Sequence, residues 1–301
     1  MFHEHGKLNH IEYFNKTHRE KVKNIITNNQ KEELYMSDRR NLYFFHHHDA
    51  QMMDQVASLY ELADRYDFHV VDNPNEANII VSVGGDGTFL QAVRKTGFRQ
   101  DALYAGISTT GNLSMYCDFH ISETSKMIDA MTKEQVEIRR YPTIDILIDD
   151  GSSFRCLNEF SIRSGIIKTF VMDVFIDDFH FETFRGDGMI LATPTGSTAY
   201  NKSVNGAVVD PMLPCIQVSE LASLNNNRYR TLGSSFILSG ERKLKLKIVQ
   251  AGNDYPIMGM DNEALSIQHV KSIEAKLSGE KIKTVKLKDN SFWEKVKRTF
   301  L

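Results

Sequence analysis

Hydrophobic and polar positions change their spacing near the middle of the chain. Between residues 37 and 135, short apolar runs alternate with stretches whose apolar residues recur at helical spacing, which predicts strands followed by helices. Asn78–Val83 is one such strand, and residues 52–66 carry one such helical stripe. This alternation is typical of an α/β domain with a mostly parallel sheet, whose ligands bind at the carboxyl ends of the strands.

After residue 135 apolar and polar residues alternate at a spacing of two, and turn residues interrupt the pattern. This predicts a β-rich C-terminal domain over residues 136–288. Residues 289–301 combine a capping residue with an amphipathic stripe, so we expect a helix that packs back on the first domain. The expected strands are Val136–Ile138, Ile144–Ile148, Thr169–Ile176, Phe179–Phe184, Ser235–Leu238, Leu244–Val249 and Ile273–Leu277.

Residues 1–36 differ from the rest, because charges alternate there with sparse apolar residues. Lys31-Glu32-Glu33 can be encoded by a purine-rich run like a bacterial ribosome-binding site, at a suitable distance ahead of Met36. Our hypothesis is that residues 1–35 are a translated leader and that the native protein starts at Met36. The alternative is a genuine N-terminal extension, either disordered or forming one surface helix.

Composition and charge exclude several classes of function. The chain has 301 residues, of which 41% are hydrophobic, so it can bury the core of two modest domains. A net charge of −3 argues against a general nucleic-acid binder, and no apolar run is long enough to span a membrane. Cys117, Cys156 and Cys215 are widely spaced and odd in number, which indicates reduced thiols in a cytoplasmic protein.

The glycine turn Gly84-Gly85-Asp86-Gly87-Thr88 follows the strand Asn78–Val83 and opens a helix. Glycines let backbone N–H groups approach phosphate oxygens, and the helix dipole favours anions there. A carboxylate among phosphates is repulsive unless it holds a metal or removes a proton, so Asp86 is the candidate for chemistry. The alternative is a plain Asp-Gly turn without a ligand.

Two further segments suggest a nucleotide pocket. Thr193–Ser203 is rich in hydroxyl groups around Gly196, and Tyr200 offers a flat face for a base; the alternative is a loop between strands. Asn158 and Glu159 put an amide beside a carboxylate on a strand, and a carboxylate is a recurring way to hold ribose hydroxyls. The alternative for Glu159 is a surface residue on an edge strand.

Taken together, the glycine turn, Asn158-Glu159, Arg185–Gly188 and Thr193–Tyr200 resemble the NAD kinase family in order and spacing. The resemblance runs from about Asp38 to the C-terminus and is nearest to the short NAD kinases of Gram-positive bacteria such as Bacillus. The glycine turn alone is less specific, because lipid kinases and phosphofructokinases carry related turns. The run Thr-Pro-Thr-Gly-Ser-Thr-Ala-Tyr is much more specific.

The resemblance implies a fold like that of NAD and diacylglycerol kinases. It also implies transfer of the γ-phosphate of ATP, with Mg²⁺ or another divalent metal, to the 2′-hydroxyl of the adenosine ribose of NAD, giving NADP. Asp86 matches the family's proton acceptor, Gly84, Gly85, Gly87 and Thr88 match the phosphate-binding turn, and no metal ligand is assigned to the protein. The implied NAD contacts are Asp86, Gly87, Asn158, Glu159, Arg185, Asp187, Thr198, Ala199, Tyr200, Asn201, Lys202, Ser203 and Ala222.

Other features leave alternatives open. The family often has Asp-Gly or Asp-Ser followed by Gln where this chain has Gly259–Glu263, so the roles of Asn262 and Glu263 are not set. His46–His48 is expected to be a solvated or phosphate-near loop, because adjacent histidines rarely converge on one metal ion. A lipid kinase and a non-catalytic NADP(H) sensor are the rival functions. Unpaired strand edges favour a homo-oligomer, a dimer or a tetramer.

Overall fold

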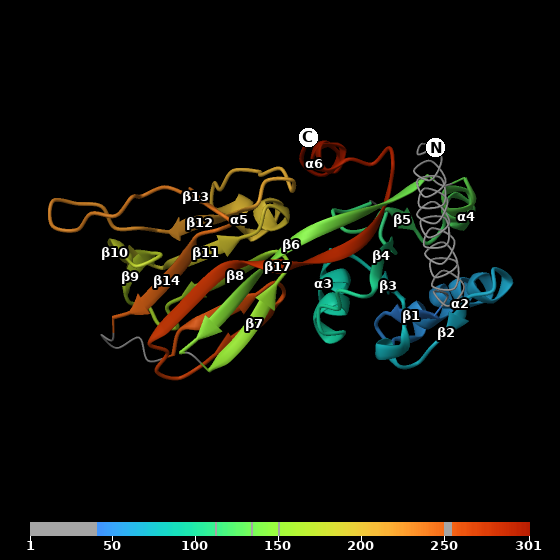
Figure 1. The fold of residues 1–301 in the computed structure, drawn as a ribbon, viewed down its shortest axis with the longest axis horizontal. Coiled ribbons are helices and arrows are strands. Elements are labelled where there is room, and N and C mark those ends of the chain that lie inside the picture. Colours follow the sequence, from blue (N-terminus) through green and yellow to red (C-terminus); the bar gives the residue numbers. More distant parts are fainter. Residues whose placement is uncertain (1–40, 112, 134, 150, 250–254) are drawn as a thin grey trace, which may run out of the picture.

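The computed structural model describes residues 41–301 except 112, 134, 150 and 250–254. The predicted leader or extension, residues 1–36, lies outside the described residues. Two halves are visible in Figure 1, an α/β half and a β-rich half, and long strands run from one into the other. Within the described part, no helix is both long and apolar enough to cross a membrane.

The α/β half contains parallel strands in the order β2-β1-β3-β4, with β5 beside β4. Apolar side chains of α2 and α4 cover one face of this sheet, and those of α3 and α6 cover the other. The elements are β1 (Asn41–Phe45), α2 (Ala50–Arg65), β2 (His69–Val70), η1 (Pro74–Glu76), β3 (Ile79–Val83), α3 (Asp86–Lys95), β4 (Leu103–Ser108), β5 (Phe119–His120) and α4 (Thr124–Thr132).

The β-rich half packs two sheets face to face around an apolar core. One is a six-stranded antiparallel sheet in the order β13-β12-β11-β8-β15-β16. The other belongs to the same eleven-stranded sheet as β1–β5 and runs β10-β9-β14-β17, with β6 beside β17 and β7 beside β6. The elements are β6 (Val136–Ile148), β7 (Ser152–Cys156), β8 (Glu159–Arg163), β9 (Phe170–Ile176), β10 (Phe179–Gly186), β11 (Gly188–Ala192), η2 (Thr195–Thr198), α5 (Tyr200–Ser203), β12 (Cys215–Leu221), β13 (Phe236–Ser239), β14 (Lys243–Ile248), β15 (Ile257–Met260), β16 (Glu263–Ser266) and β17 (Ser272–Leu287).

Strands β6 and β17 connect the halves (Figure 1), which the sequence pattern did not reveal. They pair antiparallel from Ile148↔Ile273 to Val136↔Leu287, with an irregularity between Leu277 and Lys281. The sequence predicts only short strands there, because the regular alternation of apolar residues breaks off where the strands leave the core between the two sheets. β17 then pairs in parallel with β4, so one sheet passes through both halves.

Helix α6 (Phe292–Phe300) lies across the junction of the two halves (Figure 1). It begins with a capping box, in which Ser291 and Glu294 satisfy each other's backbone N–H groups. Phe292 packs into the core beside α3, while the indole N–H of Trp293 donates to Asp210 of the β-rich half at 2.9 Å. The helix therefore contacts both halves. The three cysteines are buried and free, as the sequence predicts.

Candidate active site

The glycine turn brings Asp86 to the first residue of α3. Gly84 has a φ of +153°, and a Cβ there would lie 2.3 Å from the hydroxyl oxygen of Thr88, so this position requires glycine. Gly85 and Gly87 have open space where a side chain would stand. The N-terminus of α3 is therefore accessible to an anion such as a phosphate group.

Three donors hold the carboxylate of Asp86, and all come from residues 114–116. Oδ1 accepts from the hydroxyl of Ser114 at 2.6 Å and from the backbone N–H of Tyr116 at 2.8 Å. Among the described residues, Oδ2 accepts only the backbone N–H of Met115, at 3.0 Å. A carboxylate offers about four acceptor positions, so Oδ2 keeps one for a further partner.

Tyr116 connects Asp86 with the Asn158-Glu159 pair. Its backbone N–H binds Asp86, and its side-chain hydroxyl donates to Oδ1 of Asn158. The ring stacks on Phe89 of α3, with centroids 4.8 Å apart. Burial raises the pKa of Tyr116 well above its ordinary value, so the hydroxyl keeps its proton and acts as a donor. The sequence offered no local signal for this residue.

Asn158 and Glu159 are buried at the start of β8, an inner strand of the six-stranded sheet. The alternative of a surface residue on an edge strand is therefore wrong for Glu159, because β11 and β15 cover both edges of β8. The side chain of Asn158 faces Tyr116, whereas one carboxyl oxygen of Glu159, Oε2, is buried without a hydrogen-bond partner among the described residues. A ligand hydroxyl is one group that could satisfy that oxygen.

Asp261 supports this pair and was not predicted as a site residue. Its carboxylate accepts the backbone N–H groups of Leu157 at 3.1 Å, Asn158 at 2.7 Å and Glu159 at 3.3 Å. The guanidinium of Arg94 on α3 lies 2.9 Å from the same carboxylate. Asp261 thus joins the strand that carries Asn158 and Glu159 to the helix that begins at Asp86. Burial raises the pKa of Asp261 above its ordinary value, and these donors oppose the rise.

Burial and the charge of Asp261 together raise the pKa of Glu159 to about 8, although the backbone N–H of Tyr200 partly counters them. In the ligand-free protein Glu159 is therefore mainly protonated at neutral pH. A ligand that brings two hydroxyl donors to this carboxyl favours its ionised form, because hydrogen bonds to a carboxylate lower its pKa. Such a ligand and the carboxylate stabilise each other.

The Thr193–Ser203 segment packs directly on Asn158. A Cβ at Gly196 would lie 2.0 Å from the carbonyl oxygen of Asn158, and the backbone N–H of Thr193 donates to that oxygen at 2.8 Å. The hydroxyl of Thr198 donates to the carbonyl of Thr195 within the loop, at 3.1 Å. This hydroxyl therefore donates to the backbone of its own loop, which stiffens the loop where it packs against Asn158.

A cavity of about 1180 Å³ extends from Tyr200 along the β-rich half. Asp187, Tyr200 and Ala222 line it, together with the cationic side chains of Arg163 and Lys168. Asp86, Gly87, Asn158 and Glu159 do not line this cavity. Tyr200 joins the two parts, because its backbone N–H contacts Glu159 while the residue borders the cavity.

Six further residues predicted to contact NAD do not line this cavity: Arg185, Thr198, Ala199, Asn201, Lys202 and Ser203. The guanidinium of Arg185 lies 4.4 Å from the ring centre of Tyr229, and the ammonium of Lys202 lies 4.4 Å from that of Phe300 on α6. Asn201 is fully buried and accepts from Ser219. Ala199 links η2 to α5, and the Ser203 hydroxyl donates to the Tyr200 carbonyl at 2.7 Å.

The two residues with open roles contact α3. The amide of Asn262 donates to the carbonyl of Gly87 at 3.3 Å, and Glu263 lies 3.8 Å from the guanidinium of Arg94. Both strengthen the junction around Asp261. Across the described residues, no group of three or more histidine, cysteine, aspartate or glutamate side chains is placed to hold a metal ion.

Comparison with known proteins gives consistent relatives. Residues 157–287 match a family model described as the ATP-NAD kinase C-terminal domain. An NAD kinase 2 from Bacillus subtilis is 69% identical over 263 residues, which are 87% of this chain and 98% of that protein. A yeast NADH kinase, solved in complex with NADH, has a TM-score of 0.70 at 18% identity and covers 86% of this chain and 87% of its own. An NAD kinase from Archaeoglobus fulgidus, solved in complex with ATP, has a TM-score of 0.66 at 23% identity over 86% of this chain and 98% of its own. The last two show the likeness of the fold.

Proposed function

The chain belongs to the NAD kinase family, and we propose that it transfers the γ-phosphate of ATP to the 2′-hydroxyl of the adenosine ribose of NAD. The observation that carries this proposal is the single frame that joins Asp86, Tyr116 and the Asn158-Glu159 pair. This frame holds the carboxylate of Asp86 at the N-terminus of α3 and connects it with the pair that contains Glu159, which supports a proton-accepting role for Asp86 and a hydroxyl-binding role for Glu159. A lipid kinase would have no use for the second feature.

Asp86 is the proposed proton acceptor. A secondary hydroxyl is a weak nucleophile at neutral pH, and a carboxylate within hydrogen-bond reach makes it a better one. Oδ2 has the free acceptor position, so it takes the proton as the ribose oxygen forms its bond to the γ-phosphorus. The bond between that phosphorus and the bridging oxygen breaks, and ADP leaves with the electron pair. Phosphoryl transfer otherwise depends mainly on positioning and charge stabilisation.

The remaining residues are proposed to bind the substrates. Glu159 accepts hydrogen bonds from vicinal ribose hydroxyls through Oε2. The side chain of Asn158, next to it, is held in place by the hydroxyl of Tyr116. The cavity beside Tyr200 receives the rest of the dinucleotide, and the open N-terminus of α3 receives phosphate. The proposed dinucleotide contacts are Arg185, Asp187, Thr198, Ala199, Tyr200, Asn201, Lys202, Ser203 and Ala222, and the proposed phosphate contacts are Gly84, Gly85, Gly87 and Thr88.

A divalent ion such as Mg²⁺ would be held by the phosphates of ATP, since the described residues offer no cluster of metal ligands of their own. When bound, it neutralises charge on the transferred phosphoryl group. We also propose a homo-oligomer, because β13 and β16 are edges of the six-stranded sheet. A cytoplasmic location agrees with the three free thiols. Residues 1–35 remain proposed as a leader, which N-terminal sequencing of protein expressed from its own promoter tests.

The direct test incubates the purified protein with Mg-ATP and either NAD or diacylglycerol. We expect NADP, identified by its reduction with a dehydrogenase that requires the 2′-phosphate, and no phosphatidic acid. Parallel reactions with NADH and with polyphosphate define the acceptor and the donor. Phosphorylation of diacylglycerol, or binding of NAD without turnover, would contradict the proposal in favour of the lipid kinase or the sensor.

A further inference from the structure

Residues 113–118 form a short backbone segment that lies between Asp86 and α6. Its N–H groups at Met115 and Tyr116, and the hydroxyl of Ser114, donate to Asp86. The carbonyl groups of Leu113 and Met115 accept hydrogen bonds from side chains of α6. In the part of the chain that the structure describes, every donor to the Asp86 carboxylate comes from this one segment, so the contacts that fix the segment also fix the proposed proton acceptor.

The opposite side of the segment is held by cationic side chains of α6. The ammonium of Lys295 donates to the carbonyl of Met115 at 3.0 Å and lies 2.8 Å from Oδ2 of Asp118. The guanidinium of Arg298, one turn further along, donates to the carbonyl of Leu113 at 3.3 Å. Helix α6 thus contacts backbone carbonyls on both sides of Ser114.

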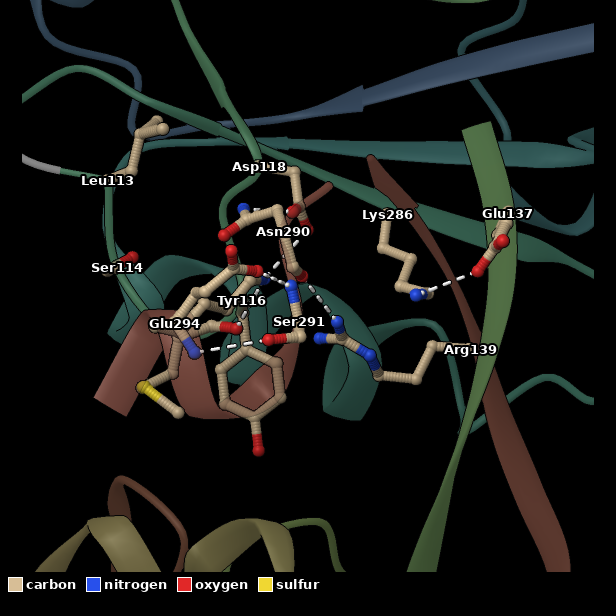
Figure 2. A network of polar contacts seen from close by, with 12 residues as sticks. Leu113, Ser114, Tyr116, Asp118, Glu137, Arg139, Lys286, Asn290, Ser291 and Glu294 are labelled. Carbon is tan, nitrogen blue, oxygen red and sulfur yellow. Dashed lines mark hydrogen bonds and ion pairs between the residues drawn. The ribbon is translucent and has the colours of Figure 1, made fainter. Parts of the chain in front are cut away.

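Lys295 and Asp118 form a buried ion pair, with side chains 1% and 3% exposed. Burial lowers the pKa of Lys295, and Asp118 opposes that effect. Asn290 completes the cluster. Its side-chain amide donates to Oδ1 of Asp118, and its backbone carbonyl accepts from the guanidinium of Arg139 at 3.0 Å. Figure 2 shows Asn290 between Asp118 and Arg139, with the Ser291–Glu294 capping box beside it. A buried ion pair needs such supporting hydrogen bonds to compensate for the loss of hydration.

We propose that Lys295, together with Asp118, is a positioning residue that sets the orientation of the Asp86 carboxylate through Met115. The inference rests on the proposed role of Asp86 as the proton acceptor. The carbonyl of Met115 shares a planar peptide group with the N–H of Tyr116, which binds Oδ1, and the Cα of Met115 joins this group to the N–H that binds Oδ2. A shift of the carbonyl away from Lys295 therefore displaces both donors. Oδ2 is the oxygen proposed to take the proton. A displacement of about 1 Å at a reacting group can lower the rate by about 100-fold.

The positioning role also explains why the charged side chain of Lys295 is buried in α6. A helix that merely needed to dock would be served by an apolar residue, because replacing a buried ion pair by apolar residues of similar volume is often neutral or stabilising. Lys295 instead directs a donor at a backbone carbonyl. The same helix carries Lys297, which is exposed and provides a matched control.

The experiment compares the full-length double variant Lys295→Met/Asp118→Asn with Lys297→Met. The double substitution removes both charges, so it leaves no buried ion without a partner. We expect a kcat about 10- to 100-fold below that of the wild type, with KM for NAD and for ATP within about three-fold, while Lys297→Met keeps wild-type values. Circular dichroism establishes that the variant is folded. A wild-type kcat, a parallel change of kcat and KM, or failure of the double variant to fold would each overturn the positioning role.

A mutant cycle with Asp86→Asn separates this inference from the proposed function. If Lys295 acts through Asp86, then the double substitution should reduce kcat by less than about three-fold in the Asp86→Asn background, because the group that it positions no longer accepts a proton. An equal loss in both backgrounds would refute the inference and leave the function of Asp86 untouched. Wild-type activity of Asp86→Asn alone would refute the proposed proton acceptor.

Discussion

The hydroxyl of Tyr116 donates a hydrogen bond to Oδ1 of Asn158. Tyr116 belongs to the α/β half of the chain and Asn158 to the β-rich half, so this contact crosses the junction on which the site is built. The backbone N–H of the same tyrosine holds Asp86. One aromatic residue therefore connects the proposed proton acceptor with the proposed ribose-binding pair.

Tyr116→Phe should keep the stack on Phe89 but leave the buried Oδ1 of Asn158 without that donor. We expect a loss of about 1–3 kcal/mol in the free energy of unfolding, which is the usual cost of an unsatisfied buried acceptor. KM for NAD should rise more than kcat falls, because the amide of Asn158 loses its fixed orientation. Urea denaturation and initial rates measure both. Tyr60→Phe, at a residue that is 40% exposed, serves as the control and should change neither quantity.

Asp261→Asn should destabilise the junction strongly. The substitution removes the charge that three backbone N–H groups and Arg94 share, and disruption of a buried ion pair costs about 3–5 kcal/mol. It should also lower the pKa of Glu159, because the charge of Asp261 is one cause of the rise in that pKa. Denaturation together with titration of Glu159 by NMR checks both effects. Asp129→Asn breaks an exposed pair with Lys133, so it should cost only about 0.5 kcal/mol. An equal cost for the two variants would contradict this account.

Stability should depend on pH through Glu159. The pKa of this group is about 8 in the folded protein and 4.5 in its ordinary environment, so the folded state binds the proton more tightly. Its contribution to stability is therefore complete below about pH 4.5 and is lost as the pH rises through about 8. Relative to the wild type, Glu159→Gln should gain thermal stability as the pH is raised from 6 to 9. A difference in Tm that stays constant over this range would disprove the assignment.

The sequence predicts the local parts of the site better than the contacts between them. The glycine turn, the helix after it and the Asn158-Glu159 strand follow from periodicity and residue type, because each involves neighbours in the chain. Asp261 lies about one hundred residues from the N–H groups that it binds, and it stands beside Asn262 and Glu263, the residues that the family pattern singled out. In the sequence, Asp261 is a single carboxylate between two short strands, and this pattern does not indicate which backbone groups it binds.

Tyr116 and Lys295 illustrate the same limit. Phe89, Tyr116 and Tyr141 pack as ordinary aromatic core residues, and nothing in the spacing of apolar positions indicates that one hydroxyl spans two halves of the site. Lys295 occupies the buried face of α6, where an amphipathic pattern calls for an apolar residue. That departure from the pattern was visible in the sequence, but its partner Asp118 could be identified only from the fold.

Asp86 is proposed to accept the proton of the ribose hydroxyl, and Asp86→Asn removes this ability without changing the size of the side chain. Asparagine keeps the size of the side chain and still accepts hydrogen bonds through its amide oxygen, but it cannot take a proton. With Mg-ATP and NAD as substrates, we expect a kcat about 10²- to 10⁴-fold below the wild-type value and a KM for NAD changed by no more than about three-fold. A folded Asp86→Asn protein that makes NADP within a few-fold of the wild-type rate would contradict it.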